Sequence, residues 1–184
     1  LLAGQRLGGY QSAVTPELLR ENLKIPPEVK AKLLALAKEL TLQAKTPQEK
    51  AEIITAWFQK HFTYSLKIGD IPKDWDPTSY FVIYKKPGYC SWFASGLTLM
   101  LRSLDIPAHV ISGWRNMEYH RLSGQWVVRE KEAHNWVEVL DRKSGVWQTF
   151  DPTPPAQFES ITGSGQKAGF WVQSRWNFSR CTGT

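Results

Sequence analysis

The sequence predicts an α+β domain, because helical patterns fill its first half and strand patterns fill its second half. Apolar residues recur every three or four positions in 25–40, 46–61 and 90–104, which is typical of helices with one buried face. From residue 108 onward the apolar residues fall in short runs bounded by turn-forming residues, which favours strands. Helices followed by antiparallel strands give an α+β architecture.

The first two helices have clear starting signals. Ile25-Pro26-Pro27-Glu28 places proline and an acid in the first turn of one helix, where both are favourable. Thr46-Pro47-Gln48-Glu49 opens the next, with Thr46 as N-cap and Glu49 completing a capping box. That helix is expected to end near His61. Their buried faces are expected to contain Val29, Leu33, Leu36, Ala37 and Leu40, then Ala51, Ile54, Trp57 and Phe58.

A long ordered loop is expected over residues 62–89, and loops of this length in compact domains often carry function. A third helix is expected from about Cys90 to Leu104, because Asp105-Ile106-Pro107 ends it. Four strands are then expected, with residues 141–145 as the hairpin loop between the last two. Their ranges are 108–114, 125–130, 133–140 and 146–150.

Three regions are expected along the 184 residues. Residues 1–24 are mixed and rich in glycine, so we expect an irregular N-terminal arm. Residues 25–155 contain all the periodic patterns and form the predicted domain. Residues 156–184 are polar, with Gly163-Ser164-Gly165-Gln166 resembling a linker, so we expect a linker-like tail whose tryptophans could dock on the domain.

The composition excludes several classes of protein. The net charge is +6, but lysine and arginine are scattered without a run of four, so a nucleic-acid partner is not expected. No stretch of 18 apolar residues occurs, so no membrane span is expected within this chain. No residues show the spacing of metal ligands, and neither a metal nor another cofactor is expected. The two cysteines, Cys90 and Cys181, are interpreted as unpaired, because Cys181 lies near the chain end.

Cys90 is the leading candidate for a reactive side chain. Lys86-Pro87-Gly88-Tyr89 precedes it with turn-forming residues and a helical pattern follows, which places the thiol at a helix N-terminus. Unpaired backbone N–H groups and the helix dipole favour the thiolate there, and the thiolate is the nucleophilic form. The alternative is a buried structural cysteine, which is the common fate of a lone thiol.

His134 and Asp151 are the candidate partners of that thiol, because a cysteine nucleophile needs a base and an orienting group. His134 begins one expected strand and Asp151 ends the next. If residue 140 pairs with 146, residue 134 faces 152, and a shift of one residue pairs it with Asp151. The two side chains should therefore lie at the same end of adjacent strands. Alternatively, His134 is a cross-strand polar residue and Asp151-Pro152 is a simple turn.

Three ordered blocks of sequence resemble the transglutaminase-like superfamily. They are Gly88-Tyr89-Cys90-Ser91-Trp92-Phe93-Ala94-Ser95 with 101–114, then Ala133-His134-Asn135-Trp136-Val137-Glu138-Val139, then 147–154. The helical part is similar to a bacterial branch of this superfamily in which the domain is tethered to the inner membrane. The resemblance implies a papain-like fold, with the helix of the nucleophile packed on an antiparallel sheet.

The resemblance also implies roles for individual residues. Cys90 is expected as the nucleophile, His134 as the base and Asp151 as the orienting acid. The oxyanion is expected to be held by the Cys90 backbone N–H and a second donor, for which Tyr64 is the candidate. Ser91 departs from many bacterial members, which carry an acidic residue after the cysteine; this difference concerns substrate preference more than chemistry.

The implied activity is acyl transfer through a thioester, from a glutamine carboxamide of a protein or peptide substrate to an amine or water. A cysteine peptidase or amidase of the same fold is one alternative. A catalytically silent domain that binds peptides or cell-wall material is another. The resemblance further implies an extracytoplasmic domain of a membrane-anchored envelope protein, with membrane contact only through segments outside this chain.

Overall fold

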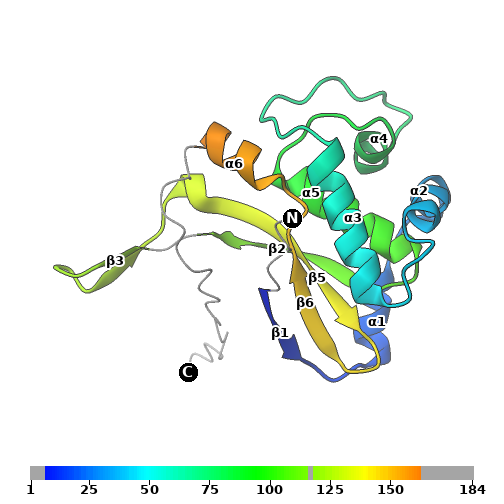
Figure 1. The fold of residues 1–184 in the computed structure, drawn as a ribbon, viewed down its shortest axis with the longest axis horizontal. Helices are drawn as coiled ribbons and strands as arrows, with labels where there is room; N and C mark the ends of the chain where they lie inside the picture. Colours follow the sequence, from blue (N-terminus) through cyan, green and yellow to red (C-terminus); the bar gives the residue numbers. More distant parts are fainter. Residues whose placement is uncertain (1–6, 116–117, 163–184) are drawn as a thin grey trace, which may run out of the picture.

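Four antiparallel strands form the main sheet, in the order β1-β6-β5-β2 (Figure 1). The computed structural model describes residues 7–115 and 118–162. A second, two-stranded sheet made of β3 and β4 projects beyond the main sheet (Figure 1). The strands are Leu7–Gln11 (β1), Ala108–Trp114 (β2), Glu118–His120 (β3), Gln125–Val127 (β4), Ala133–Asp141 (β5) and Val146–Phe150 (β6).

Four helices gather on one side of the main sheet (Figure 1). They are Pro27–Leu40 (α2), Pro47–His61 (α3), Pro77–Ile83 (α4) and Cys90–Ser103 (α5). Helix α5 packs on β5 and β2, whereas α3 packs on β5 and β6. Helix α1 (Pro16–Leu23) contacts β2, and α6 (Pro155–Thr162) follows β6. This arrangement confirms the predicted α+β fold with the helix of Cys90 on an antiparallel sheet.

An aromatic cluster forms the centre of the core between α3, α4 and α5. Phe58, Phe62, Phe81 and Phe93 are all buried, and the Phe58–Phe62 ring centroids lie 4.8 Å apart. Gly96 allows α3 and α5 to approach, because a Cβ there would lie 2.9 Å from Cζ of Phe58. The buried apolar residues around this centre include Val29, Leu33, Ala37, Ala51, Ile54, Val82, Ala94, Leu97, Met100, Leu101, Val137 and Val139.

The expected irregular arm over residues 1–24 is wrong for its described part, which contains β1 and α1. Strand β1 adds to β6, and the Tyr10 hydroxyl donates to Oε2 of Glu138 at 3.2 Å. Helix α1 starts from Thr15, whose hydroxyl accepts from the Leu18 N–H. Thr15-Pro16-Glu17 repeats the kind of start seen in 46–49 and could have identified α1. The glycine-rich strand gives no local signal, because its pairing depends on a distant edge.

Two further expectations of irregular chain are also wrong. The predicted loop over 62–89 contains α4, which Asp76 caps by accepting from the Ser79 N–H at 2.7 Å. The described start of the expected tail over 156–184 is α6, in which Phe158 is buried. The strand expected over 125–130 is shorter, since β4 ends at Val127 and a 3₁₀ turn occupies Glu130–Glu132.

Several sequence-based features of the remaining chain are confirmed. The capping box of α3 forms with both of its hydrogen bonds, and α5 begins at Cys90. The hairpin loop lies between β5 and β6 as expected. The linker-like Gly163–Gln166, the tryptophans beyond it and Cys181 lie outside the described residues. Within 7–115 and 118–162, no helix combines the length and apolar character that crossing a membrane requires.

We predict that Phe58→Ala lowers the free energy of unfolding by about 3–5 kcal/mol, because it opens a cavity in the aromatic cluster. Chemical denaturation followed by circular dichroism measures this change. Leu66→Ala is the control, since Leu66 is 62% exposed and its loss should cost no more than about 0.5 kcal/mol. Equal losses for the two variants would contradict the placement of the core.

Candidate active site

Cys90 is the first residue of α5, and the residue before it supplies no cap. Tyr89 occupies the N-cap position without a side-chain hydrogen bond to the helix. The first backbone N–H groups of α5 therefore remain directed toward the helix end, where they favour a negative charge. The thiol itself is half-buried, so it is accessible while partly shielded from water.

The surroundings of Cys90 favour its thiolate. Burial raises the pKa of the thiol, but hydrogen bonding and Coulombic attraction to His134 outweigh that effect. Backbone N–H groups of Asn135 and Ser91 act in the same direction, and the resulting pKa lies below the ordinary value of cysteine. The lone thiol is thus held by a base and by peptide dipoles, which a structural cysteine does not require.

His134 and Asp151 form a short, shielded hydrogen bond. Nε2 of His134 lies 2.7 Å from Oδ2 of Asp151, and the His134 side chain is fully buried. The other oxygen of Asp151 accepts from the Thr153 N–H at 3.0 Å. On the far side, the Gln59 amide from α3 donates to the Asp151 carbonyl at 2.8 Å. The carboxylate is therefore fixed by its own turn, and the backbone that carries it is held by a neighbouring helix.

The strand register that brings these groups together differs from both registers considered from the sequence. Asp141 pairs with Val146 and Val137 with Phe150. Continued along the strands, this register sets His134 opposite position 153, two residues beyond Asp151. Side chains two residues apart share a face of the sheet, so the contact is diagonal. The expectation that both groups lie at the same end of adjacent strands is confirmed.

The protonation of His134 follows from its two neighbours. Burial lowers its pKa, but attraction to Asp151, a hydrogen bond to Asp151 and interaction with Cys90 together raise it to about 9. Nδ1 is buried and has no hydrogen-bond partner that meets normal geometry. Because Nε2 is held by Asp151, Nδ1 is the ring nitrogen left to face the thiol. The charges on the Cys90 thiolate and the His134 imidazolium therefore stabilise each other.

Tyr64, the expected second oxyanion donor, lies beside the thiol. Burial raises the pKa of Tyr64 to about 12, with the nearby Cys90 charge as the next cause, so the phenol stays protonated. Its hydroxyl interacts with both the thiol and the backbone N–H of Cys90. A parallel bridge between Tyr64 and Gly88 sets this position, and Gln157 accepts from the Tyr64 N–H at 2.7 Å.

Sequence reasoning missed two residues that organise this site. Phe158 of α6 packs edge-on against His134, with ring centroids 4.8 Å apart, and also against Tyr64 at 5.4 Å. Asn135 donates through Nδ2 to Oγ of Ser91, which connects β5 directly to α5. Asn135 follows His134 and Ser91 follows Cys90, so adjacency to the two candidate residues was an available signal. Phe158 had none, because its segment was interpreted as a tail.

The other histidines lie elsewhere in the structure. His109 contacts Asn22 and Glu138 at 2.8 and 3.1 Å, which ties α1 to the sheet. His120 contacts Ser123 within the β3–β4 hairpin, and His61 ends α3. In the described part of the chain, no three or more His, Cys, Asp or Glu side chains are arranged to hold a metal ion.

Comparison with known proteins agrees with this fold. Residues 34–152 match the family model of the transglutaminase-like superfamily. The chain is 32% identical over 148 residues to the uncharacterized protein YebA of Bacillus subtilis (strain 168), covering 75% of this chain and 20% of YebA. It is 28% identical over 144 residues to a protein-glutamine gamma-glutamyltransferase of Pseudomonas aeruginosa, covering 78% of this chain and 21% of that protein.

A solved structure shares the fold. The periplasmic domain of TgpA from Pseudomonas aeruginosa superposes with a TM-score of 0.70 and 26% identity, covering 84% of this chain and 54% of that domain. The chain spans about a fifth of the length of the two curated relatives. The likeness therefore concerns one domain of longer proteins.

We predict that the alkylation rate of Cys90 by iodoacetamide inflects at a pH below the ordinary pKa of a thiol. The cause is the stabilisation of the thiolate by His134 and by the helix terminus. Mass spectrometry of the Cys90 peptide measures the rate separately from that of Cys181. In His134→Gln the inflection should move upward. A rate that follows a free thiol, or a disulfide between Cys90 and Cys181, would contradict this assignment.

Proposed function

Because this chain belongs to the transglutaminase-like superfamily, we propose that it is a cysteine acyltransferase that acts on glutamine carboxamides of proteins or peptides. The observation that carries the proposal is the partly buried 2.7 Å contact between His134 and Asp151, next to a thiol with a lowered pKa. The relative from Pseudomonas aeruginosa named as a protein-glutamine gamma-glutamyltransferase supports the same reaction.

The first half of the reaction forms a thioester. The Cys90 thiolate attacks the carboxamide carbon, a C–S bond forms, and the carbonyl oxygen becomes an oxyanion. The oxyanion then collapses and the C–N bond breaks, while the His134 imidazolium gives its proton to the departing ammonia. Asp151 keeps the imidazole in the orientation in which Nδ1 faces the reaction centre.

The oxyanion is stabilised by two donors in this proposal. One is the Cys90 backbone N–H, which lies at the start of α5. The other is the Tyr64 hydroxyl, whose raised pKa keeps it protonated and able to donate. Donors that are fixed before the reaction stabilise a developing charge without reorganisation.

The second half of the reaction releases the acyl group. An amine such as a lysine side chain attacks the thioester carbon, His134 accepts its proton, and the Cys90 thiolate departs. Water in place of the amine would give glutamate, which is the hydrolytic alternative on the same residues. Labelled-amine incorporation and conversion of glutamine to glutamate distinguish the two products by mass.

We predict that Cys90→Ala abolishes labelled-amine incorporation into a glutamine-donor peptide, measured by mass spectrometry, with little loss of stability. Asp151→Asn should lower turnover by up to about 10⁴, the cost of the analogous change in a serine protease. Tyr64→Phe should lower it by about 10²–10³, as expected for one oxyanion donor.

Asp141→Asn and Tyr84→Phe are the matched controls, because both residues lie outside the site and should retain full turnover. Near-normal turnover in Asp151→Asn would reduce Asp151 to a turn residue. An inactive but folded wild-type protein whose thiol reacts like free cysteine would instead indicate a silent binding domain.

We also propose that the domain is extracytoplasmic within an envelope protein anchored by segments outside this chain. The support is its likeness to a periplasmic domain and its coverage of only a fifth of its relatives. We predict that protease added to spheroplasts that produce the full-length protein degrades this domain. A domain that resists protease until the cells are lysed would overturn the location and leave the chemistry unaffected.

A further inference from the structure

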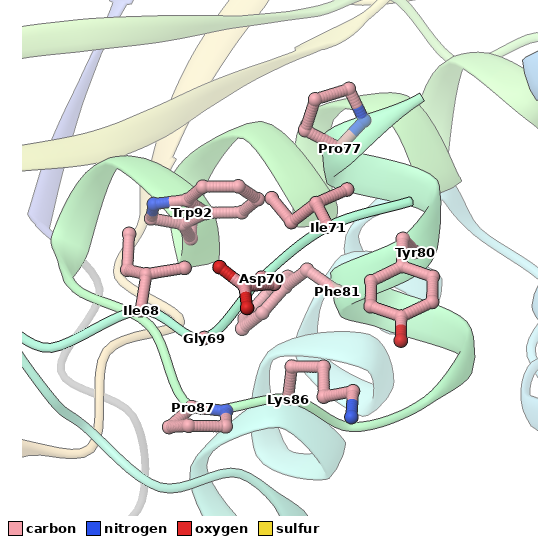
Figure 2. Close-up of a pocket in the computed structure, with 10 residues that line it drawn as sticks. All are labelled: Ile68, Gly69, Asp70, Ile71, Pro77, Tyr80, Phe81, Lys86, Pro87 and Trp92. Carbon is pink, nitrogen blue, oxygen red and sulfur yellow. The ribbon is translucent and has the colours of Figure 1, made fainter. Parts of the chain in front are cut away.

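A pocket of about 280 Å³ lies between α4, the start of α5 and the segment that follows Tyr64 (Figure 2). Its walls are largely apolar, and two charged side chains, Asp70 and Lys86, also line it. The volume is at the lower limit of small-molecule sites, so it suits a single amino-acid side chain. The apolar lining consists of Ile68, Ile71, Pro77, Tyr80, Phe81, Pro87 and Trp92.

The pocket adjoins the candidate active site through both chain segments that build it. The chain runs from Tyr64 into the wall at 68–71, and from the wall at Lys86 and Pro87 onward to Cys90. The two segments are held together at Gly88, which accepts from the Ser65 N–H and donates to the Thr63 carbonyl. Pro87 is three residues from Cys90, so their Cα atoms are at most about 11 Å apart.

The two charged side chains of the pocket, Asp70 and Lys86, differ in their contacts. Asp70 is an exposed residue that lines the pocket together with Ile68, Phe81 and Trp92 (Figure 2). Among the described residues, no hydrogen bond or ion pair engages this carboxylate. The Lys86 ammonium, by contrast, makes a cation–π contact with Tyr80, 5.4 Å from the ring centroid. A carboxylate beside an indole ring is suited to a cation that carries an apolar stem.

We propose that this pocket receives a lysine or arginine side chain of the glutamine-donor peptide, with Asp70 pairing its charged end and Trp92 packing on its stem. The inference rests on the proposed function, since it assumes a peptide bound at Cys90. An extended peptide advances about 3.3 Å per residue, so the basic residue lies two or three positions from the reactive glutamine. Selectivity for a basic residue near the glutamine follows.

Binding to Cys90→Ala tests the proposal without requiring turnover. Fluorescence anisotropy measures the affinity of a labelled glutamine peptide that carries lysine three positions from the glutamine, and of the same peptide with norleucine in place of lysine. Peptides with lysine on the N-terminal side and on the C-terminal side are both tested first, and the side that binds more tightly is used. We expect the lysine peptide to bind about five- to tenfold more tightly, because an exposed ion pair and a cation–π contact are each modest. Asp70→Asn in the same background should remove that preference, whereas Asp74→Asn should keep it.

The effect of Lys86→Gln on peptide affinity shows whether the bound side chain is positively or negatively charged. It removes a like charge, so the lysine peptide should bind as tightly or more tightly. Equal binding of lysine and norleucine peptides to Cys90→Ala, or a preference unchanged by Asp70→Asn, would overturn the proposal. So would weaker binding in Lys86→Gln together with a preference for glutamate peptides.

Activity separates this inference from the proposed function. If the wild-type protein transfers amine to both peptides equally, the acyltransferase stands and the pocket assignment fails. If Cys90→Ala binds the lysine peptide in an Asp70-dependent way but the wild type shows no turnover, the pocket stands and the reaction fails. In an active enzyme, Asp70→Asn should raise KM for the lysine peptide about five- to tenfold with kcat unchanged.

Discussion

The packing of α5 on β5 and β2 is the constraint on which the site depends. The apolar face of α5 is buried, with Phe93, Leu97 and Leu101 fully inaccessible to solvent. Burial of such side chains favours one position of the helix by several kcal/mol, so the N-terminus of α5 has little freedom to move. Cys90 therefore meets the start of β5, where His134 lies. The Asn135–Ser91 hydrogen bond joins the same two elements at the same end, which makes the contact directional as well as close.

The site also depends on the shielding of His134 from solvent. Phe158 covers the imidazole from α6, and Gln157 on the same helix accepts from the Tyr64 N–H. One short helix thus shields the base and holds the candidate oxyanion donor. Because the His134 side chain is fully buried and the Asp151 side chain is only 19% exposed, their electrostatic interaction is stronger than that of an exposed pair. The shielding comes from a segment that follows the last strand, so the site needs residues beyond the expected boundary at 155.

The sequence predicted the elements whose positions are set by neighbouring residues. Capping residues located α3, the turn residues before Cys90 located α5, and strand patterns located β2, β5 and β6. Only the approximate position of the His134–Asp151 contact was available, because register depends on how the hairpin closes and on packing across the sheet. Strand β1 was missed, since two glycines in five residues carry no strand preference and its partner lies over 130 residues away. Helix α6 was missed because a polar, glycine-rich continuation masks its short apolar pattern.

The pKa shifts of Cys90 and His134 favour one order of steps in the proposed reaction. Burial opposes charge on both Cys90 and His134, yet the thiol pKa is lowered and the imidazole pKa is raised, because each charge stabilises the other and Asp151 adds to the second. In the proposed reaction, this mutual stabilisation of charge favours the thiolate as the attacking form of Cys90. In that proposed reaction, His134 would act first as an acid toward the leaving ammonia and later as a base toward the incoming amine. An orienting carboxylate matters in both steps, because the imidazole must keep Nδ1 toward the sulfur whether or not it carries the proton.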